Sequence, residues 1–163
     1  MKILQNNTTS NVQNPRTCNC INKFTCPLNN NCLIENIVYQ ATITSNESNY
    51  EPKFYIGISE STFKKRFANH KKSFNIKKYE KDTELSKEYW KIKEKNYTPL
   101  VTWKIIKKCS PYNPNTKRCH LCLNEKLEIA QFQNNTLLNK RSELVSKCRH
   151  ETKYTLIKHD SKD

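Results

Sequence analysis

Arg66 and His70 are the first two residues whose types and spacing could do chemistry. They lie four positions apart in a segment with helical periodicity, so they share one side of that helix. Phe63 and Phe67 form its apolar face, and Arg66 and His70 flank this face on one edge. An arginine there can donate two hydrogen bonds to a phosphate. The alternative is a solvated basic edge whose aliphatic stems cover phenylalanine.

Four lysines crowd the same helical segment and would add to its positive charge. They are Lys64, Lys65, Lys71 and Lys72. Lysine side chains suit contacts with a nucleic-acid backbone, which position a duplex without reading its base sequence. We therefore expect this helix to present a DNA-binding surface.

Glu125 is a carboxylate in the middle of an apolar helical face. Leu121, Cys122, Ile129 and Phe132 occupy one arc of the helical wheel, and Glu125 lies within that arc. A carboxylate in such a place is costly unless it is paired or holds a metal ion. Magnesium prefers oxygen ligands and is often held by one carboxylate with phosphate and water. Glu125 is therefore a candidate magnesium ligand, and the alternative is a buried salt bridge with a lysine.

The only glycine of the chain is Gly57, in the segment Tyr55-Ile56-Gly57. Glycine lets another backbone or a ligand approach closely, or permits an unusual dihedral angle at the end of a strand. The simpler interpretation is a backbone adjustment between a strand and a turn. Asn139 gives a weaker signal, because most asparagines that follow a helix are caps or turn residues.

The eight cysteines fall into two groups. The first group is Cys18, Cys20, Cys26 and Cys32, and four thiolates suit tetrahedral zinc. The second group is Cys109, Cys119, Cys122 and Cys148, in which His120 or His150 could replace a cysteine. Structural zinc is the favoured interpretation of the first group and an open one for the second. The alternatives are reduced buried thiols, or disulfides if the protein is secreted.

Alternating apolar and polar residues predict three strands, over residues 37–43, 54–58 and 100–106. The first two form an antiparallel hairpin around a polar loop. Helical periodicity predicts one helix that begins near Thr62, with Ser59 or Ser61 as its cap, and others over 84–95, 118–132 and 141–148. This order indicates an α+β fold, with a small three-stranded antiparallel sheet flanked by helices.

The domain organisation follows from the change of composition along the 163 residues. We expect a disordered tail over 1–17, a cysteine-rich, zinc-knuckle-like segment over 18–35, one domain over 36–150 and a basic tail over 151–163.

The charge of the chain restricts its partners. The formal net charge is +14 and the isoelectric point is near 9.5. Such a field attracts polyanions, of which nucleic acid is the usual one and an anionic membrane surface the rival. No apolar run is long enough to span a bilayer, and the start lacks the apolar core of a signal peptide. We therefore expect an intracellular protein, located in the nucleus, that binds DNA and no membrane.

Together these residues resemble the GIY-YIG nuclease domain, from about residue 37 to residue 148. Tyr55-Ile56-Gly57 matches the second half of the motif, and Ile37-Val38-Tyr39 stands at the first half with its glycine lost. Arg66, Glu125 and Asn139 best match the helix arginine, the metal-binding glutamate and the late asparagine of the family. The endonuclease domain of Penelope-like retroelements is similar to four strings: CNCINKFTCPLNNNC, YIGISESTFKKRFANHKKSF, CHLCLNEK and LLNKRSELVSKCRH.

The resemblance implies a magnesium- or manganese-dependent endonuclease that nicks DNA by hydrolysing one phosphodiester bond. Glu125 would hold the ion, Arg66 would neutralise the phosphate, and Tyr39 or Tyr55 would orient or deprotonate the attacking water. His70 would assist or hold the phosphate, and Asn139 would position the substrate or the ion. A reverse transcriptase is an expected partner if the domain belongs to a retroelement.

Two other functions fit fewer of these features. The lost first glycine favours a zinc-stabilised nucleic-acid-binding module without catalysis, for which a salt-sensitive gel shift without cleavage is the expected behaviour. Charge alone is compatible with a structural RNA-associated protein, which would prefer folded RNA.

Overall fold

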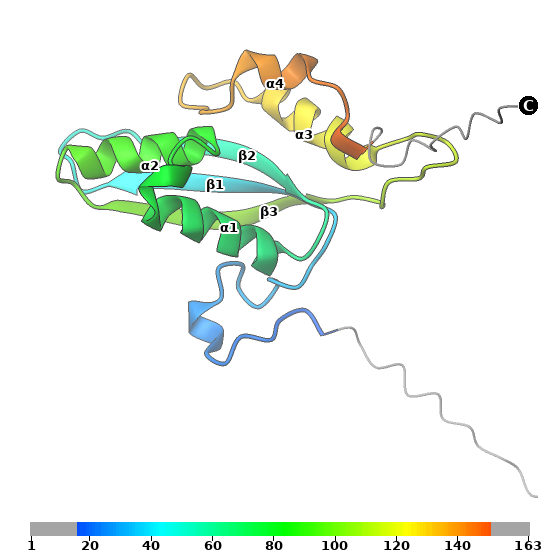
Figure 1. Cartoon of the computed structure of the whole chain (residues 1–163), viewed down its shortest axis with the longest axis horizontal. Helices are drawn as coiled ribbons and strands as arrows, with labels where there is room; N and C mark the ends of the chain where they lie inside the picture. Colours follow the sequence, from blue (N-terminus) through cyan, green and yellow to red (C-terminus); the bar gives the residue numbers. More distant parts are fainter. Residues whose placement is uncertain (1–15, 151–163) are drawn as a thin grey trace, which may run out of the picture.

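The computed structural model of the chain describes residues 16–150. The tail expected over 151–163, and all but the last two residues of the tail expected over 1–17, lie outside the described residues. The fold is α+β, as expected, with a three-stranded antiparallel sheet (Figure 1). Its strands are β1 (Ile37–Ser45), β2 (Lys53–Ser59) and β3 (Pro99–Lys108). Its helices are α1 (Phe63–Asn75), α2 (Glu84–Glu94), α3 (His120–Gln131) and α4 (Arg141–Val145), with single 3-10 turns at Lys23–Thr25 and Lys77–Tyr79.

The central strand of the sheet is β1, which pairs with β2 on one side and with β3 on the other. The predicted hairpin is confirmed, and its register places Tyr39 opposite Gly57. A β-bulge between Val38 and Tyr39 interrupts the pairing with β3, where Tyr39 lies opposite Ile105. Because directly opposed residues project from the same face of a sheet, Gly57 lies beside the ring of Tyr39.

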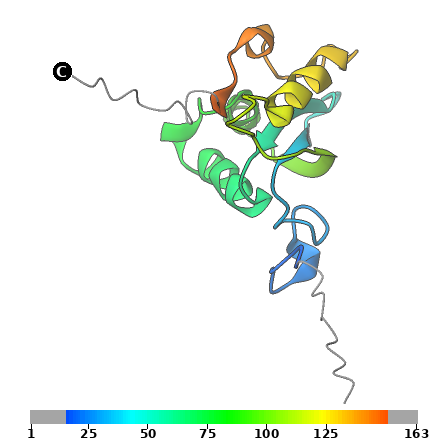
Figure 2. The same ribbon diagram turned by 90° about the vertical axis from the view of Figure 1, so that its right-hand side faces the viewer.

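The two faces of the sheet bury different hydrophobic clusters. Helices α1 and α2 cover one face, and α3 covers the other (Figures 1 and 2). The first cluster contains Ile37, Tyr39, Ala41, Ile43, Tyr55, Phe63, Phe74, Leu85 and Ile92. The second contains Val38, Ile56, Ile58, Leu121, Cys122 and Ile129. Strand β1 is buried on both faces, and its odd and even residues therefore serve different cores.

One expected helix cap and two expected helix ends differ from the structure. Helix α1 has Thr62 as its N-cap, without a side-chain cap bond, and the hydroxyl of Ser59 instead donates to the carbonyl of Ser61. Helix α3 begins after Cys119, whose sulfur accepts the N–H of Cys122, so residue 118 is not helical. Helix α4 ends at residue 145, because the chain beyond it bends back toward the start of α3 to form the second cysteine group.

The outer edge of β2 is partly covered by the segment that follows α3. The N–H of Phe54 donates to the carbonyl of Thr136 at 3.0 Å, and the N–H of Leu138 donates to the carbonyl of Phe54 at 2.7 Å. Asn139 continues this contact through its side chain to Ile56. The cover therefore reaches as far as Ile56 and leaves the last residues of β2 beside a cleft.

The cysteine-rich segment, residues 18–35, docks on the start of α1. Two backbone N–H groups at the N-terminus of α1 lack partners within the helix, and carbonyl groups of the cysteine-rich segment accept their hydrogen bonds. Phe63 donates to the carbonyl of Ile34 at 3.0 Å, and Lys64 donates to that of Cys32 at 2.7 Å. The side chain of Leu28 is buried in the first core cluster. Within residues 16–150, no helix combines the length and the apolar character needed to cross a membrane.

Candidate active site and two metal-binding clusters

Tyr39, Arg66 and His70 form a buried cluster between β1 and α1. The hydroxyl oxygen of Tyr39 accepts the Nε–H of Arg66 at 3.0 Å and lies 2.7 Å from Nε2 of His70. Because Arg66 already donates to this oxygen, the phenolic proton is satisfied when it points at His70. The four-residue spacing on α1 therefore brings both side chains to one tyrosine.

Burial decides the protonation of this cluster. Burial raises the pKa of Tyr39, although the positive charge of Arg66 opposes that shift. Burial and, to a lesser extent, Arg66 lower the pKa of His70 to about 3. At neutral pH the cluster therefore consists of a phenol, a neutral imidazole and a guanidinium. His70 lies buried beneath the helix edge on which it was expected and carries no charge for a phosphate.

Gly57 provides the space in which the ring of Tyr39 lies. A Cβ atom at position 57 would be 2.5 Å from Oη and 2.7 Å from Cζ of Tyr39, and 3.1 Å from Cε1 of Tyr55. The backbone of Gly57 does not have a positive φ, so an unusual dihedral angle is not the reason for glycine. The close approach of a tyrosine side chain is the reason.

Replacing Gly57 by alanine is expected to lower the free energy of unfolding by about 2 kcal/mol, because a fully buried Tyr39 must move. Urea denaturation measures this change. The control is the same substitution in a Tyr39→Leu background, which lacks the obstructing atoms. There it is expected to cost less than about 1 kcal/mol. An equal cost in both backgrounds would show that Tyr39 is not the obstacle.

Glu125 lies on α3 and is only 8% exposed. Burial raises the pKa of its carboxyl group, and the charge of Arg149, followed by that of Arg66, acts in the opposite direction. The nearest ion-pair partner is Nη2 of Arg149, 3.8 Å from Oε1. The alternative partner expected for Glu125 was a lysine, and the partner is an arginine at a distance too long for a hydrogen bond.

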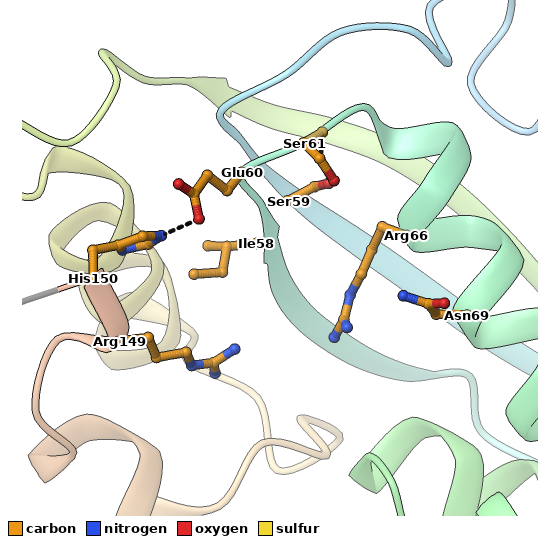
Figure 3. Close-up of a pocket in the computed structure, with 8 residues that line it drawn as sticks. All are labelled: Ile58, Ser59, Glu60, Ser61, Arg66, Asn69, Arg149 and His150. Carbon is orange, nitrogen blue, oxygen red and sulfur yellow. Dashed lines mark hydrogen bonds and ion pairs between the residues drawn. The ribbon is translucent and has the colours of Figure 1, made fainter. Parts of the chain in front are cut away.

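A cleft opens at the uncovered end of β2. It has a volume of about 550 Å³, and its lining residues are Ile58, Ser59, Glu60, Ser61, Arg66, Asn69, Arg149 and His150. Figure 3 shows Arg66 and Arg149 reaching into it from opposite sides, one from α1 and one from the segment after α4. A second hollow of about 480 Å³ shares Arg66, Asn69 and Arg149 and extends to Tyr55 and Glu143. The two hollows adjoin each other at Arg66, Asn69 and Arg149, which line both, and together they are called the channel below.

Asn139 holds the edge of the sheet. Its Oδ1 accepts the N–H of Ile56 at 2.8 Å, and its Nδ2 donates to the carbonyl of Ile56 at 2.8 Å and to Glu143 at 2.6 Å. Both N–H groups of the amide are therefore used within the protein. This geometry gives Asn139 a positioning role for β2.

The four lysines of α1 are exposed and divide into two pairs. At about 100° per residue, Lys65 and Lys72 lie next to the side of α1 that bears Arg66, and Lys64 and Lys71 lie opposite. The Nζ of Lys64 donates to Oδ1 of Asn19 in the cysteine-rich segment at 2.7 Å. None of the four lysines is among the residues that line the two hollows, so any contact of theirs with DNA would lie outside the channel.

The first cysteine group could hold a metal ion such as zinc. Its four sulfur atoms, from Cys18, Cys20, Cys26 and Cys32, lie within 4.8 Å of one another. Three of the sulfur–sulfur distances are 3.6, 3.7 and 3.7 Å. Tetrahedral zinc with bonds of about 2.3 Å requires about 3.8 Å between sulfurs. Burial acts to raise the pKa of Cys26, but N–H groups of Leu28 and Asn30 outweigh it and lower this pKa to about 7.

The second group that could hold a metal ion consists of Cys119, Cys122, Cys148 and His150. Nδ1 of His150 lies 3.2, 3.3 and 3.8 Å from the three sulfurs, near the value of about 3.6 Å that tetrahedral zinc requires. Cys109 was expected in this group, but it follows β3 and its sulfur is not among the ligand atoms that lie within 4.8 Å of one another. His150 is the fourth member, and His120 lies exposed at the start of α3.

Glu60 and Arg149 are the two residues of the site that were missed from the sequence. Nε2 of His150 lies 2.9 Å from Oε2 of Glu60, and a histidine that ligates a metal usually donates its other N–H to such a carboxylate. Arg149 lies between the ligand candidates Cys148 and His150 and lines the whole channel. Its position between two potential ligands was the signal that could have identified it.

Comparison of the chain with protein-family models, with curated proteins and with solved structures finds no match. The fold and the site define an α+β protein with a channel lined by two arginines and two clusters that could each hold a metal ion. All eight cysteines lie in the described residues and none forms a disulfide.

Proposed function

We propose that this chain is a magnesium-dependent DNA endonuclease of the GIY-YIG type that hydrolyses one phosphodiester bond in the channel beside β2. One observation carries the proposal. A buried tyrosine, Tyr39, holds Arg66 at 3.0 Å on one wall of the channel, and Arg149 on the opposite wall lies 3.8 Å from the buried carboxylate of Glu125. Phosphate hydrolysis needs cations around the phosphate and one carboxylate for a divalent ion; Arg66 and Arg149 would supply the cations, and Glu125, next to Arg149, the carboxylate.

Arg66 is proposed to bind the phosphate that is cleaved. Its Nε–H is used by Tyr39, and a guanidinium group carries further N–H donors in a planar fork that matches phosphate oxygens. Tyr39 is fully buried, so it acts as a positioning residue for Arg66 and not as a group that meets water. His70 supports Tyr39 from the other side.

Tyr55 is proposed to orient the attacking water. It lines the channel, whereas Tyr39 does not. Burial raises the pKa of Tyr55, and the charge of Arg66 only partly opposes this shift. Tyr55 is therefore a neutral phenol at physiological pH and orients water as a hydrogen-bonding group.

Glu125 fits a magnesium site that has one protein carboxylate. Burial leaves its ionised form poorly stabilised, and Arg149 is too distant for a direct hydrogen bond, so a cation would relieve the cost of the buried charge. A divalent ion, magnesium or manganese, would stabilise charge that develops on the leaving oxygen when bound. Phosphate and water would provide the remaining ligands.

The two cysteine clusters are proposed to hold structural zinc. The distances within both clusters fit tetrahedral coordination, and sulfur with imidazole is a ligand set that zinc prefers. Zinc in the first cluster would fix the cysteine-rich segment to α1. Zinc in the second would fix the chain after α4 to α3. As a retroelement-derived nuclease, the protein would act on DNA in the nucleus, where a reverse transcriptase would be its partner.

Conversion of supercoiled plasmid to open circles tests the nuclease proposal. The parent protein is expected to nick the plasmid with magnesium and not with a chelator, and Arg66→Ala is expected to nick about 100 times more slowly. Lys107→Ala removes the same charge from the exposed surface of β3 and is expected to behave like the parent. If the parent leaves the plasmid intact under every divalent ion tried, the nuclease proposal fails.

A second candidate function is a zinc-stabilised nucleic-acid-binding module without catalysis. Two observations favour it, namely isoleucine in place of the first motif glycine and the complete burial of Tyr39. A salt-sensitive gel shift by the same preparation that leaves the plasmid intact would favour this function over the nuclease.

A further inference from the structure

We propose that Arg149 is a second phosphate-binding residue of the channel and that a metal ion in the second cysteine cluster sets its position. This inference deepens the proposed function and rests on the channel being the place where DNA binds.

The side chain of Arg149 is an exposed cation whose nearest carboxylate is too distant for a hydrogen bond, so it can bind an anion. Its side chain is 61% exposed, and its ion-pair contact is the 3.8 Å approach to Glu125. Both hollows of the channel have Arg149 in their lining. An exposed guanidinium that faces a channel and lacks a short hydrogen bond to its carboxylate can rearrange toward a phosphate at little cost.

The backbone of Arg149 is held between two candidate metal ligands. Cys148 precedes it and His150 follows it, and both belong to the second cluster. The backbone N–H of His150 donates to the sulfur of Cys148 at 3.4 Å, so the two residues on either side of Arg149 are joined. His150 is tied in addition to Glu60, in the loop between β2 and α1, at 2.9 Å. A metal ion that joins these ligands would therefore fix the Cα of Arg149 relative to α3 and to the end of β2.

Arg149 and Arg66 approach the channel from opposite walls (Figure 3). Arg66 is fixed by Tyr39 from within the core, whereas within residues 16–150 Arg149 is held through the backbone of the cluster and approaches Glu125 only at 3.8 Å. Two guanidinium groups on opposite walls suit a phosphate diester that passes between them, because each can donate a pair of hydrogen bonds. A metal ion in the second cluster would then position Arg149 in the channel, in addition to stabilising the fold.

Binding of a labelled DNA duplex tests this inference on the full, zinc-loaded chain, with calcium in place of magnesium. Arg149→Ala is expected to weaken binding about tenfold and to reduce the slope of log K against log salt by about one. Arg149→Lys is expected to recover only part of the loss, because a lysine cannot form the fork. Lys147→Ala, an exposed cation two residues away that lines neither hollow, is the matched control and is expected to bind like the parent.

The role of the metal is tested by combining variants. Cys122→Ser is expected to lose the metal of the second cluster and to weaken DNA binding as much as Arg149→Ala, and the double variant is expected to bind no more weakly than either single variant. Additive losses, or an equal loss in Lys147→Ala, would overturn the inference. If Cys122→Ser does not fold by circular dichroism, the comparison of Arg149→Ala, Arg149→Lys and Lys147→Ala in the metal-loaded protein decides whether Arg149 binds phosphate.

This test and the plasmid test fail separately. Binding that depends on Arg149 and on the metal, in a protein that never nicks plasmid, would support this inference and reject the nuclease. Nicking that does not change in Arg149→Ala, with unchanged DNA affinity, would support the nuclease and reject this inference.

Discussion

Replacing Glu125 by glutamine is expected to reduce magnesium-dependent nicking by a factor of about 1,000 or more while the fold persists. Glutamine has nearly the same shape but no charge, so it cannot hold a divalent ion as a carboxylate does. Loss of several kcal/mol of stabilisation in the transition state corresponds to a factor of this size, at about 1.4 kcal/mol per tenfold change in rate. The initial rate of formation of open circles measures the effect. The control is Glu128→Gln, a partly exposed carboxylate on the same helix, which is expected to retain the parental rate.

The stability of the same variant has an independent expectation. The pKa of Glu125 is raised by burial, so the ionised group opposes folding at any pH above its raised folded value. Glu125→Gln is therefore expected to be more stable than the parent at neutral pH without a divalent ion. That advantage is expected to shrink as the pH falls through the folded pKa and to vanish below the unfolded pKa of about 4.3. A variant that is less stable at neutral pH would show that Arg149 already compensates the charge.

Magnesium itself provides the third measurement on this residue. Ligand that binds only the folded state raises the melting temperature. Magnesium is expected to raise it in the parent and not in Glu125→Gln. An equal rise in both proteins would place the ion elsewhere.

Replacing Cys32 by serine is expected to remove the metal of the first cluster and to lower the melting temperature by about 10 °C. Cys32 is completely buried, and its carbonyl accepts the N–H of Lys64 at the start of α1. Loss of the metal frees the cysteine-rich segment, and exposing Leu28 alone costs about 2–3 kcal/mol. A protein of this size loses about 2–4 °C per kcal/mol. Elemental analysis of the purified protein, with thermal unfolding followed by circular dichroism, measures both effects.

Cys109 provides the matched control for the metal. It belongs to neither cluster, so Cys109→Ser is expected to keep the full metal content of the parent. Cys32→Ser and Cys122→Ser are each expected to lose the metal of one cluster, and together they are expected to lose both. If Cys109→Ser loses metal as well, the composition of the second cluster is wrong. If the parent contains no metal, both clusters are thiol groups of the core.

The sequence predicted the sheet well because each strand has a local signal. The alternation in β3 matches its alternating burial, the apolar run of β1 matches a strand buried on both faces, and the polar loop between the first two strands indicated the hairpin. The ends of helices were less predictable. Thr62, and not a serine, begins α1 because the orphan N–H groups there are satisfied by the backbone of residues 32 and 34, which lie about thirty positions away.

Residues of the site could be predicted where the spacing along one helix determines which side chains lie together. They could not be predicted where segments far apart in the sequence meet. The spacing of Arg66 and His70 places both on one side of α1, but burial of His70 depends on Tyr39 from another strand. Glu125 stood out as a charge in an apolar arc, yet its neighbour Arg149 comes from a segment without regular periodicity. Cys109 was grouped with Cys119 by sequence distance, whereas the fold brings His150 to that place.

The contacts that close the channel join residues far apart in the chain: Asn139 with Ile56 and His150 with Glu60, separated by 83 and 90 positions. Contacts across long loops form late, because closing the loop loses conformational entropy before the contact contributes any stabilisation. On a ribosome the chain emerges from its N-terminus, so the hairpin and α1 are available before residues 139 and 150 are made. A nascent chain therefore carries Tyr39 and Arg66 in place but has an open channel, and the capacity to act on DNA is expected only once the last described residues have been synthesised.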